Sequence, residues 1–332
     1  MTEPRPLFRT IVAATANVRH LDAPVLTAAH LAIQQSARLR IFHAIPFWDV
    51  FEPKRPTASH PAPRFHTIEN RSRDASASLL ALYSRHYPGL TGDDVVISTG
   101  VAWESLFRAA LDLKGDLVVV GPHEAVEESL KIEGVRGFLG STADGVIRQA
   151  WCPVMIANRG FNQQRLEMKK IVVGVDFSPS CIGAICLAAI VARHNDSFVS
   201  TFHMLPIAPY PKYTPQALQA DRIRRQQHMN AVCVRLLNGI VHQYFVKPGA
   251  RPHEELLRFA NQTDADLIIM GSHTREKSGK WYSGSVVQQV ACRSECPVIV
   301  VNGAQALTPW KDSLADPDGL SKTAADLSQI PF

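Results

Sequence analysis

The stretch of sequence that decides the fold spans residues 266–301 and reads DLIIMGSHTREKSGKWYSGSVVQQVACRSECPVIVV. Its apolar run 267–270 has no polar alternation and is closed by Gly271, which is typical of a strand covered on both faces, as in a parallel sheet. After a polar loop, Gly284 and Ser285 precede a segment with helical apolar spacing, and a second apolar run ends the stretch. The stretch therefore predicts a unit of strand, loop, helix and strand.

The loop and the start of the helix in this unit predict an anion-binding site. The first backbone N–H groups of a helix have no partner within it, and the helix dipole places partial positive charge at the same end. Ser285 and Val286 stand at that end, and the loop before them carries Arg275, Lys277 and Lys280. These cations would add to the N–H groups in holding a phosphate, although a solvated basic loop explains them equally well.

The sequence predicts that the chain is built from two copies of one domain, and that the stretch 266–301 belongs to the second copy. Thr10–Ala14 and Ile171–Val175 are predicted first strands, and Phe42–Ala44 recurs as Phe202–Met204. Strands that alternate with helices imply parallel, right-handed βαβ units. We therefore predict an α/β fold with two doubly wound parallel-sheet domains in tandem.

The predicted domains cover residues 1–160 and 161–303, and residues 304–332 are expected to form a flexible C-terminal tail because they lack hydrophobic periodicity. A segment rich in proline, aromatic residues and histidine, 47–66, is expected to be a loop over the strand ends. The remaining expected strands are 39–45, 95–97, 117–121, 152–157, 198–205 and 242–246. The expected helices include 23–37, 71–87, 104–113, 182–193, 216–238 and 254–262, and Gly140-Ser141 opens another.

The opening stretch is similar to the nucleotide signature of the universal stress protein family: glycine, two residues, glycine, nine residues, then glycine and serine or threonine. Here Gly271, two residues, Thr274, nine residues and Gly284-Ser285 match that signature in length. The flanking strands and the sequence Cys-Pro-Val-Ile-Val-Val at 296–301 complete the resemblance.

The resemblance implies an adenine-nucleotide α-hydrolase-like fold and a cytoplasmic, regulatory stress-response protein that binds ATP or a related adenine nucleotide. It assigns the ribose hydroxyls to Asp176, at the end of the first strand of the second half, and adenine to the backbone of Met204. Ligands of open α/β sheets do bind at the carboxyl ends of the strands. Asp176 also fits an alternative role as an ordinary turn former.

Departures from the signature bear on the ligand. Thr274 replaces the second glycine, and a β-branched residue is costly at the positive φ that glycine allows. In the first half, Thr15 is predicted at the place of Asp176 and Glu124 at that of the second glycine, in a glutamate-rich loop that is six residues longer. The first site is therefore predicted to be degenerate, and to be either structural or specific for another class of ligand.

Composition excludes several classes of protein. The chain of 332 residues is 20% charged and 46% hydrophobic, without an apolar run of membrane length or a secretory leader, so we expect a soluble, cytoplasmic protein. The second half has 16 Lys and Arg against 10 Asp and Glu, which suits a phosphate but is too modest for nucleic acid. The six cysteines have no disulfide-framework spacing and are expected to be packed, reduced thiols without a metal.

The sequence predicts no catalytic constellation. His43 and His203 lie in apolar strands and are interpreted as core histidines, and Ser285 has no base that the sequence reveals. The protein is therefore expected not to be an enzyme, with a slow ATPase as the remaining enzymatic alternative. The rival to the nucleotide-binding hypothesis is a ligand-binding or interaction scaffold of the same fold.

Two apolar strands predict how the halves are assembled. Residues 154–157 and 298–301 are closely similar and stand at the ends of the two repeats. An unpaired apolar edge strand invites aggregation, so we expect the two strands to meet in an internal pseudo-dimer. Pairing of two chains into a homodimer is a further option.

Overall fold

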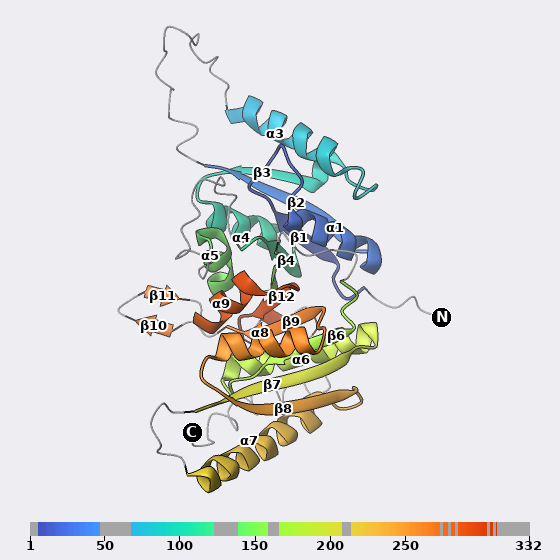
Figure 1. Ribbon diagram of the computed structural model, residues 1–332. Coiled ribbons are helices and arrows are strands. Elements are labelled where there is room, and N and C mark those ends of the chain that lie inside the picture. The colour runs from blue at the N-terminus through green and yellow to red at the C-terminus, as the bar shows by residue number, and fades with distance from the viewer. Residues whose placement is uncertain are drawn as a thin grey trace.

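The computed structural model describes residues 6–46, 68–122, 139–158, 166–207, 214–272, 275–277, 280–282, 285–303, 306–307 and 310. Within these residues one ten-stranded sheet runs through the whole protein in the order β3-β2-β1-β4-β5-β12-β9-β6-β7-β8. Figure 1 shows the two halves of the chain following one another along this sheet, and the strand order places β5 and β12 at their junction.

The first half forms one end of the sheet. Its strands are β1 (Thr10–Ala14), β2 (Arg38–Ile45), β3 (Val95–Thr99), β4 (Leu117–Val120) and β5 (Val154–Ile156). Its helices are α1 (Ala23–Gln35), α3 (Ile68–Tyr83), α4 (Ala102–Asp112) and α5 (Ser141–Gln149), with a 3-10 turn at Gly92–Asp94. All neighbouring strands of this half are parallel, and the strand order reverses between β1 and β4.

The second half repeats that order. Its strands in the main sheet are β6 (Lys170–Gly174), β7 (Phe198–Pro206), β8 (His242–Gly249), β9 (Leu267–Gly271) and β12 (Val298–Val301). Its helices are α6 (Pro179–Asn195), α7 (Pro215–Leu236), α8 (Pro252–Gln262) and α9 (Ser285–Arg293). The order reverses between β6 and β9, so the predicted pair of doubly wound domains is confirmed.

The continuous apolar runs of the sequence are explained by burial. β4 and β12 are buried at every position, because helices cover both faces of the sheet. The helix α6 is buried around most of its circumference and packs on β6, β9 and β12. All six cysteines are unpaired thiols, as expected.

The strands β5 and β12 join the halves as antiparallel neighbours, so the predicted pairing of the two apolar strands is confirmed. Met155 and Ile299 hold the same place in the two strands and pair with each other, which puts this pair on a pseudo-twofold axis. Beside the axis, Gln288 Nε2 of α9 donates to Asp144 Oδ1 of α5 at 3.3 Å.

Two asparagines at equivalent positions of the two halves form hydrogen bonds across the β5–β12 junction. Asn158 Nδ2, beyond β5, donates to the carbonyls of Ala291 (3.1 Å) and Ser294 (2.7 Å) at the end of α9. Asn302 Nδ2, beyond β12, donates to the carbonyl of Arg148 in α5 at 3.0 Å. Each asparagine therefore satisfies carbonyls near a helix C-terminus of the opposite half, as in the self-complementary interface of a twofold dimer.

Three described residues of segment 304–332 pack against the body of the protein. Ala306, Leu307 and Trp310 are buried. Trp310 Nε1 donates to the Leu7 carbonyl at 2.8 Å, and its ring meets Phe8 edge-on at 5.7 Å between centroids. The expectation of a flexible tail is wrong for these residues, because a few apolar side chains without periodicity still bury well when they meet a ready apolar surface.

Some local expectations also differ from the structure. The expected helix to Tyr87 ends at Tyr83, and Tyr87 instead donates its hydroxyl to the Ala37 carbonyl at 3.0 Å. The basic loop after β9 contains a small antiparallel hairpin, β10 (Arg275–Lys277) with β11 (Lys280–Tyr282). The expected loop 47–66 and the glutamates after β4 lie outside the described residues.

Candidate functional site

The predicted site residues of the second half lie at the point where its strand order reverses. Asp176, Met204 and Ser272 each stand two residues beyond mutually paired positions in β6, β7 and β9, so they lie at one level across three adjacent strands, near the carboxyl edge of the sheet. Gly271 is the last residue of β9. The structure therefore brings Asp176, Met204 and Gly271 to the edge at which open α/β sheets bind ligands.

The carboxylate of Asp176 is exposed and takes part in a tight turn. Its Oδ1 accepts the backbone N–H of Ser178 at 3.0 Å and the Ser178 hydroxyl at 2.6 Å. This is the turn chemistry that the sequence offers as the alternative to ribose binding. Both uses are compatible, because a carboxylate has about four acceptor sites.

Phe177 follows this carboxylate in the chain, and the sequence analysis did not single it out. Its ring is buried and lies 4.5 Å from the ring centroids of both His203 and His228. The guanidinium of Arg225 lies 5.7 Å from the Phe177 centroid, within cation–π range. An aromatic residue in an otherwise polar turn is the signal that could have revealed it.

His203 is a buried histidine held by the backbone, as the sequence predicted. Its Nδ1 lies 2.8 Å from the Val175 carbonyl, and since a carbonyl only accepts, Nδ1 carries the proton. Burial lowers the pKa of His203, so the ring is neutral. Its Nε2 is buried and has no hydrogen-bond partner within the described part of the chain. His43 makes the matching contact to the Thr15 carbonyl at 2.9 Å.

Gly271 is required by packing. A Cβ at this position would lie 2.5 Å from the Ser180 carbonyl and 2.7 Å from the Cys181 nitrogen, so β9 and the first turn of α6 meet at backbone distance. The next residue, Ser272, is buried and donates its N–H to the Val301 carbonyl at 2.9 Å. The Ser272 hydroxyl has no partner in the described residues, and it was also missed.

The helix end predicted to hold phosphate is the start of α9, which begins at Ser285 and continues with half-buried Val286. Arg275 is described by its backbone alone, where it begins β10 and pairs with Tyr282. Thr274 and Gly284 lie outside the described residues.

The first half differs at the corresponding edge. Equivalent histidine contacts show that Thr15 corresponds to Val175, and Ala16 to Asp176. The prediction that Thr15 takes the place of Asp176 is therefore wrong by one residue, a slip that sends a side chain to the opposite face of a strand. The first half has no carboxylate at this position.

A closed polar network replaces that carboxylate. Thr15 Oγ1 lies 3.1 Å from Asp22 Oδ2 and accepts the N–H of Asn17 at 3.1 Å. The hydroxyl of Tyr83, which is fully buried, accepts the N–H of Asp22 at 2.9 Å. Burial raises the pKa of Tyr83 to about 12. These polar groups satisfy one another and leave few free for a ligand.

The described residues contain neither a metal-binding cluster nor a membrane-spanning helix. Within the described ranges, no cluster of three or more His, Cys, Asp or Glu is placed to hold a metal ion. The helices of those ranges include none with the length and apolar character needed to span a membrane.

Comparisons with known proteins point to one family. The family model described as "Universal stress protein family" matches residues 7–158 and again 167–302. Over 141 residues the chain is 25% identical to universal stress protein MJ0531 of Methanocaldococcus jannaschii, an alignment covering 40% of this chain and 81% of that protein.

The fold agrees with that of a solved structure of the same family. A universal stress protein from Archaeoglobus fulgidus superimposes with a TM-score of 0.58 at 17% identity, covering 90% of this chain and 97% of its own. A shorter universal stress protein from Archaeoglobus fulgidus, solved in complex with dAMP, is 22% identical and covers 40% of this chain and 98% of its own, with a TM-score of 0.32.

Proposed function

The chain belongs to the universal stress protein family, as two copies in one chain, and from that premise we propose that its second half binds an adenine nucleotide, ATP or a close relative. The protein acts as a regulator in a stress response, in the cytoplasm, and nucleotide binding changes its conformation or its partner. The domain boundaries near residues 160 and 303 are part of this proposal.

The observation that supports it most is the convergence at the carboxyl edge of β6, β7 and β9. Asp176 can accept from ribose hydroxyls, the Met204 backbone can contact the base, and the N-terminus of α9 with Ser285 can hold phosphate. The basic excess of residues 161–303 favours the same polyanion. The first half lacks the carboxylate, so we propose one nucleotide per chain.

A second candidate is a scaffold that binds a ligand other than ATP or a protein partner. The turn between Asp176 and Ser178 favours it, because the carboxylate already has a role without a ligand. Thr274 in place of glycine favours it too, since glycine is the residue that lets backbone approach a phosphate closely. Homodimers of the whole chain would fit either candidate.

Calorimetric titration of ATP and of dAMP into the full chain and into Asp176→Ala tests the proposal. Loss of a charge-assisted ribose hydrogen bond costs about 1–3 kcal/mol, so the variant should bind roughly tenfold to a hundredfold more weakly. Equal affinity in the parent and Asp176→Ala, or no binding by the parent, would favour the scaffold.

Ser178→Ala is the matched control. It removes the hydroxyl that donates to Asp176 Oδ1 but leaves the carboxylate in place. We expect it to bind ATP at least as well as the parent, because one acceptor site is freed. A loss as large as that of Asp176→Ala would mean that the turn, and not the charge, matters.

A further inference from the structure

A cavity lies at the junction of the two halves, away from the proposed nucleotide site. It has a volume of about 760 Å³ and lies where the amino-terminal ends of β1 and β4 face the last turn of α6. This volume falls within the range of pockets that hold small organic ligands. The Asp176 turn stands at the opposite end of α6, about 20 Å away along the helix axis.

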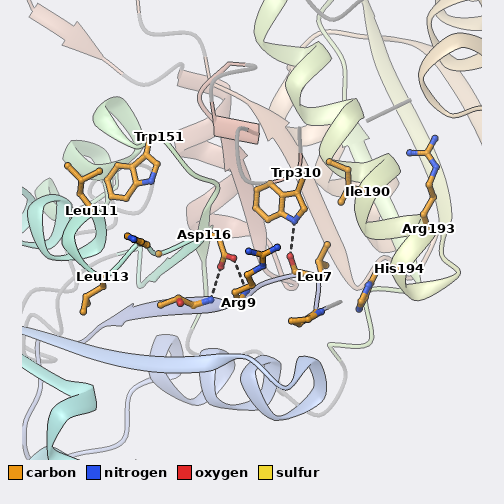
Figure 2. Close-up of a pocket in the computed structure, with 14 residues that line it drawn as sticks. Leu7, Arg9, Leu111, Leu113, Asp116, Trp151, Ile190, Arg193, His194 and Trp310 are labelled. Carbon is orange, nitrogen blue, oxygen red and sulfur yellow. Dashed lines mark hydrogen bonds between the residues drawn. The ribbon is translucent and has the colours of Figure 1, made fainter. Parts of the chain in front are cut away.

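Two tryptophans from distant parts of the chain line this junction pocket. Trp151 precedes β5, and Trp310 belongs to the docked C-terminal segment. Figure 2 shows Arg9 and Asp116 between the two indoles. Leu7, Leu111 and Ile190 add to the apolar lining. Such a lining suits a flat or aliphatic apolar body.

Each indole is fixed by a neighbour. Trp151 packs edge-on against Phe107, with 5.2 Å between ring centroids. Trp310 is held by its hydrogen bond to Leu7 and by Phe8. Fixed walls cost a ligand less ordering entropy than mobile ones.

Cations gather around the same pocket. Arg9, Lys114 and Arg193 line it, together with His194, whose pKa is lowered by burial. The one carboxylate of the lining, Asp116, is committed to the fold, because its oxygens accept the N–H groups of Arg9 (2.7 Å) and Thr10 (3.0 Å).

Part of this positive charge has a structural explanation. Lys114 follows α4 and Arg193 lies in the last turn of α6, where cations offset helix dipoles of about half a charge each. Arg193 also donates to the Asn238 carbonyl at 3.3 Å. With three cations, one carboxylate and two helix ends, the pocket keeps roughly one positive charge in excess.

Two cations remain available for a ligand. Within the described ranges, the guanidinium of Arg9 and the ammonium of Lys114 make no side-chain hydrogen bond and no close ion pair, and both residues are exposed, although the charge of Arg9 also acts on the nearby Asp116 carboxylate. Arg9 lies at no helix end, so the dipole explanation does not reach it.

We propose that the junction pocket binds a small amphipathic carboxylate, whose apolar body packs against the indoles of Trp151 and Trp310 and whose carboxylate pairs with Arg9 and Lys114. Both halves and the C-terminal segment line this pocket, so its ligand also stabilises their docking. The proposal is independent of nucleotide binding at Asp176.

Titration of the full chain with 2-naphthoate, followed by calorimetry, tests the proposal. The neutral analogue 2-naphthalenemethanol and inorganic phosphate each lack one half of the predicted ligand. We expect one naphthoate per chain, with both analogues binding at least tenfold more weakly. The double variant Arg9→Gln/Lys114→Gln should bind naphthoate at least tenfold more weakly than the parent.

Arg73→Gln supplies the matched control, since it removes an exposed cation on α3, which packs on the far edge strand β3. It should bind naphthoate as the parent does. The proposal is overturned if the parent shows no saturable binding, if the double variant binds equally, or if phosphate binds as tightly as naphthoate. Binding that arises only after removal of residues 312–332 would also overturn it, because the pocket would then be the seat of the chain's own C-terminus.

Discussion

The two halves share a fold and differ at the edge where we propose that the ligand binds. In both, a buried histidine of the second strand contacts the carbonyl that follows the first strand, His43 with Thr15 and His203 with Val175. The next residue is Ala16 in one half and Asp176 in the other. The first half therefore keeps the framework of the proposed site but lacks the carboxylate that we propose binds ribose in the second half.

The two halves also differ in backbone strain at this edge of the sheet. Phe177 has a φ of 60°, a conformation that is costly for a bulky residue, and its counterpart Asn17 is not in that region. The packing of Phe177 between two histidines holds it there. Strain that surrounding contacts maintain is common at binding sites, so this difference favours the second half as the functional one.

The largest expected effect comes from the C-terminal segment, whose Trp310 is buried and contacts Leu7 and Phe8 at the start of the first half. Trp310→Ala should cost about 3–5 kcal/mol in unfolding free energy, as for other buried large-to-small changes. Urea unfolding of the variant against the parent measures it.

Two truncations sharpen this prediction. A chain ending at Gly303 should lose stability as Trp310→Ala does, and a chain ending at Lys311 should keep most of it. Removal of a flexible tail, as the sequence predicted for residues 304–332, would be harmless, whereas the burial of Leu307 and Trp310 predicts a loss of stability. Equal stability of the two truncated chains would show that Trp310 contributes nothing.

The next effect tests the closed network of the first half. Tyr83→Phe leaves the Asp22 N–H without its acceptor in a buried place and should cost about 1–2 kcal/mol. The native fold raises the pKa of Tyr83 from 10 to about 12. The neutral Tyr83 hydroxyl therefore contributes fully to the free energy of unfolding below pH 10, and this contribution is lost as pH rises toward 12. The difference in unfolding free energy between parent and variant should shrink across that range.

The sequence predicted the architecture well because its signals are local and redundant. Uninterrupted apolar runs such as 267–270 and 298–301 indicate buried parallel strands, and the similarity of 298–301 to 154–157 indicated the β5–β12 junction. The contacts of Trp310 with Leu7 and Phe8 could not be predicted, because they join residues some 300 positions apart without any periodic pattern.

The candidate site was predicted only in part, for a similar reason. Asp176 and Gly271 could be placed because they follow or end an apolar run, and Met204 because the pattern Phe42–Ala44 recurs at Phe202–Met204. The one-residue error at Thr15 arose because a strand end shows no boundary in sequence, and only the histidine contact fixes the register. Phe177 and Ser272 were missed since their burial depends on α7 and on β12, which are distant in the chain.

A smaller effect is expected at Thr274, which takes the place of the second glycine of the signature in the second half. Thr274→Gly would restore the residue type that permits positive φ, at a cost of backbone entropy of about 0.5–1 kcal/mol. If threonine hinders the approach of backbone to phosphate, ATP should bind up to about tenfold more tightly, and AMP, which lacks the outer phosphates, should gain less. Unchanged ATP affinity would show that Thr274 does not hinder ATP binding.

The smallest effect is expected at the matching position of the first half, and it decides how far that half has diverged. Glu124→Gly removes one carboxylate and restores a glycine, yet Glu127, Glu128 and Glu133 remain in the same loop and continue to repel a triphosphate. Ala16→Asp restores the carboxylate, yet Tyr83 and Asp22 still occupy the polar groups behind it. We expect neither change, nor both together, to raise the stoichiometry above one ATP per chain in calorimetry. A second equivalent of ATP bound by the double variant would contradict this, and would mean that two substitutions alone separate the halves.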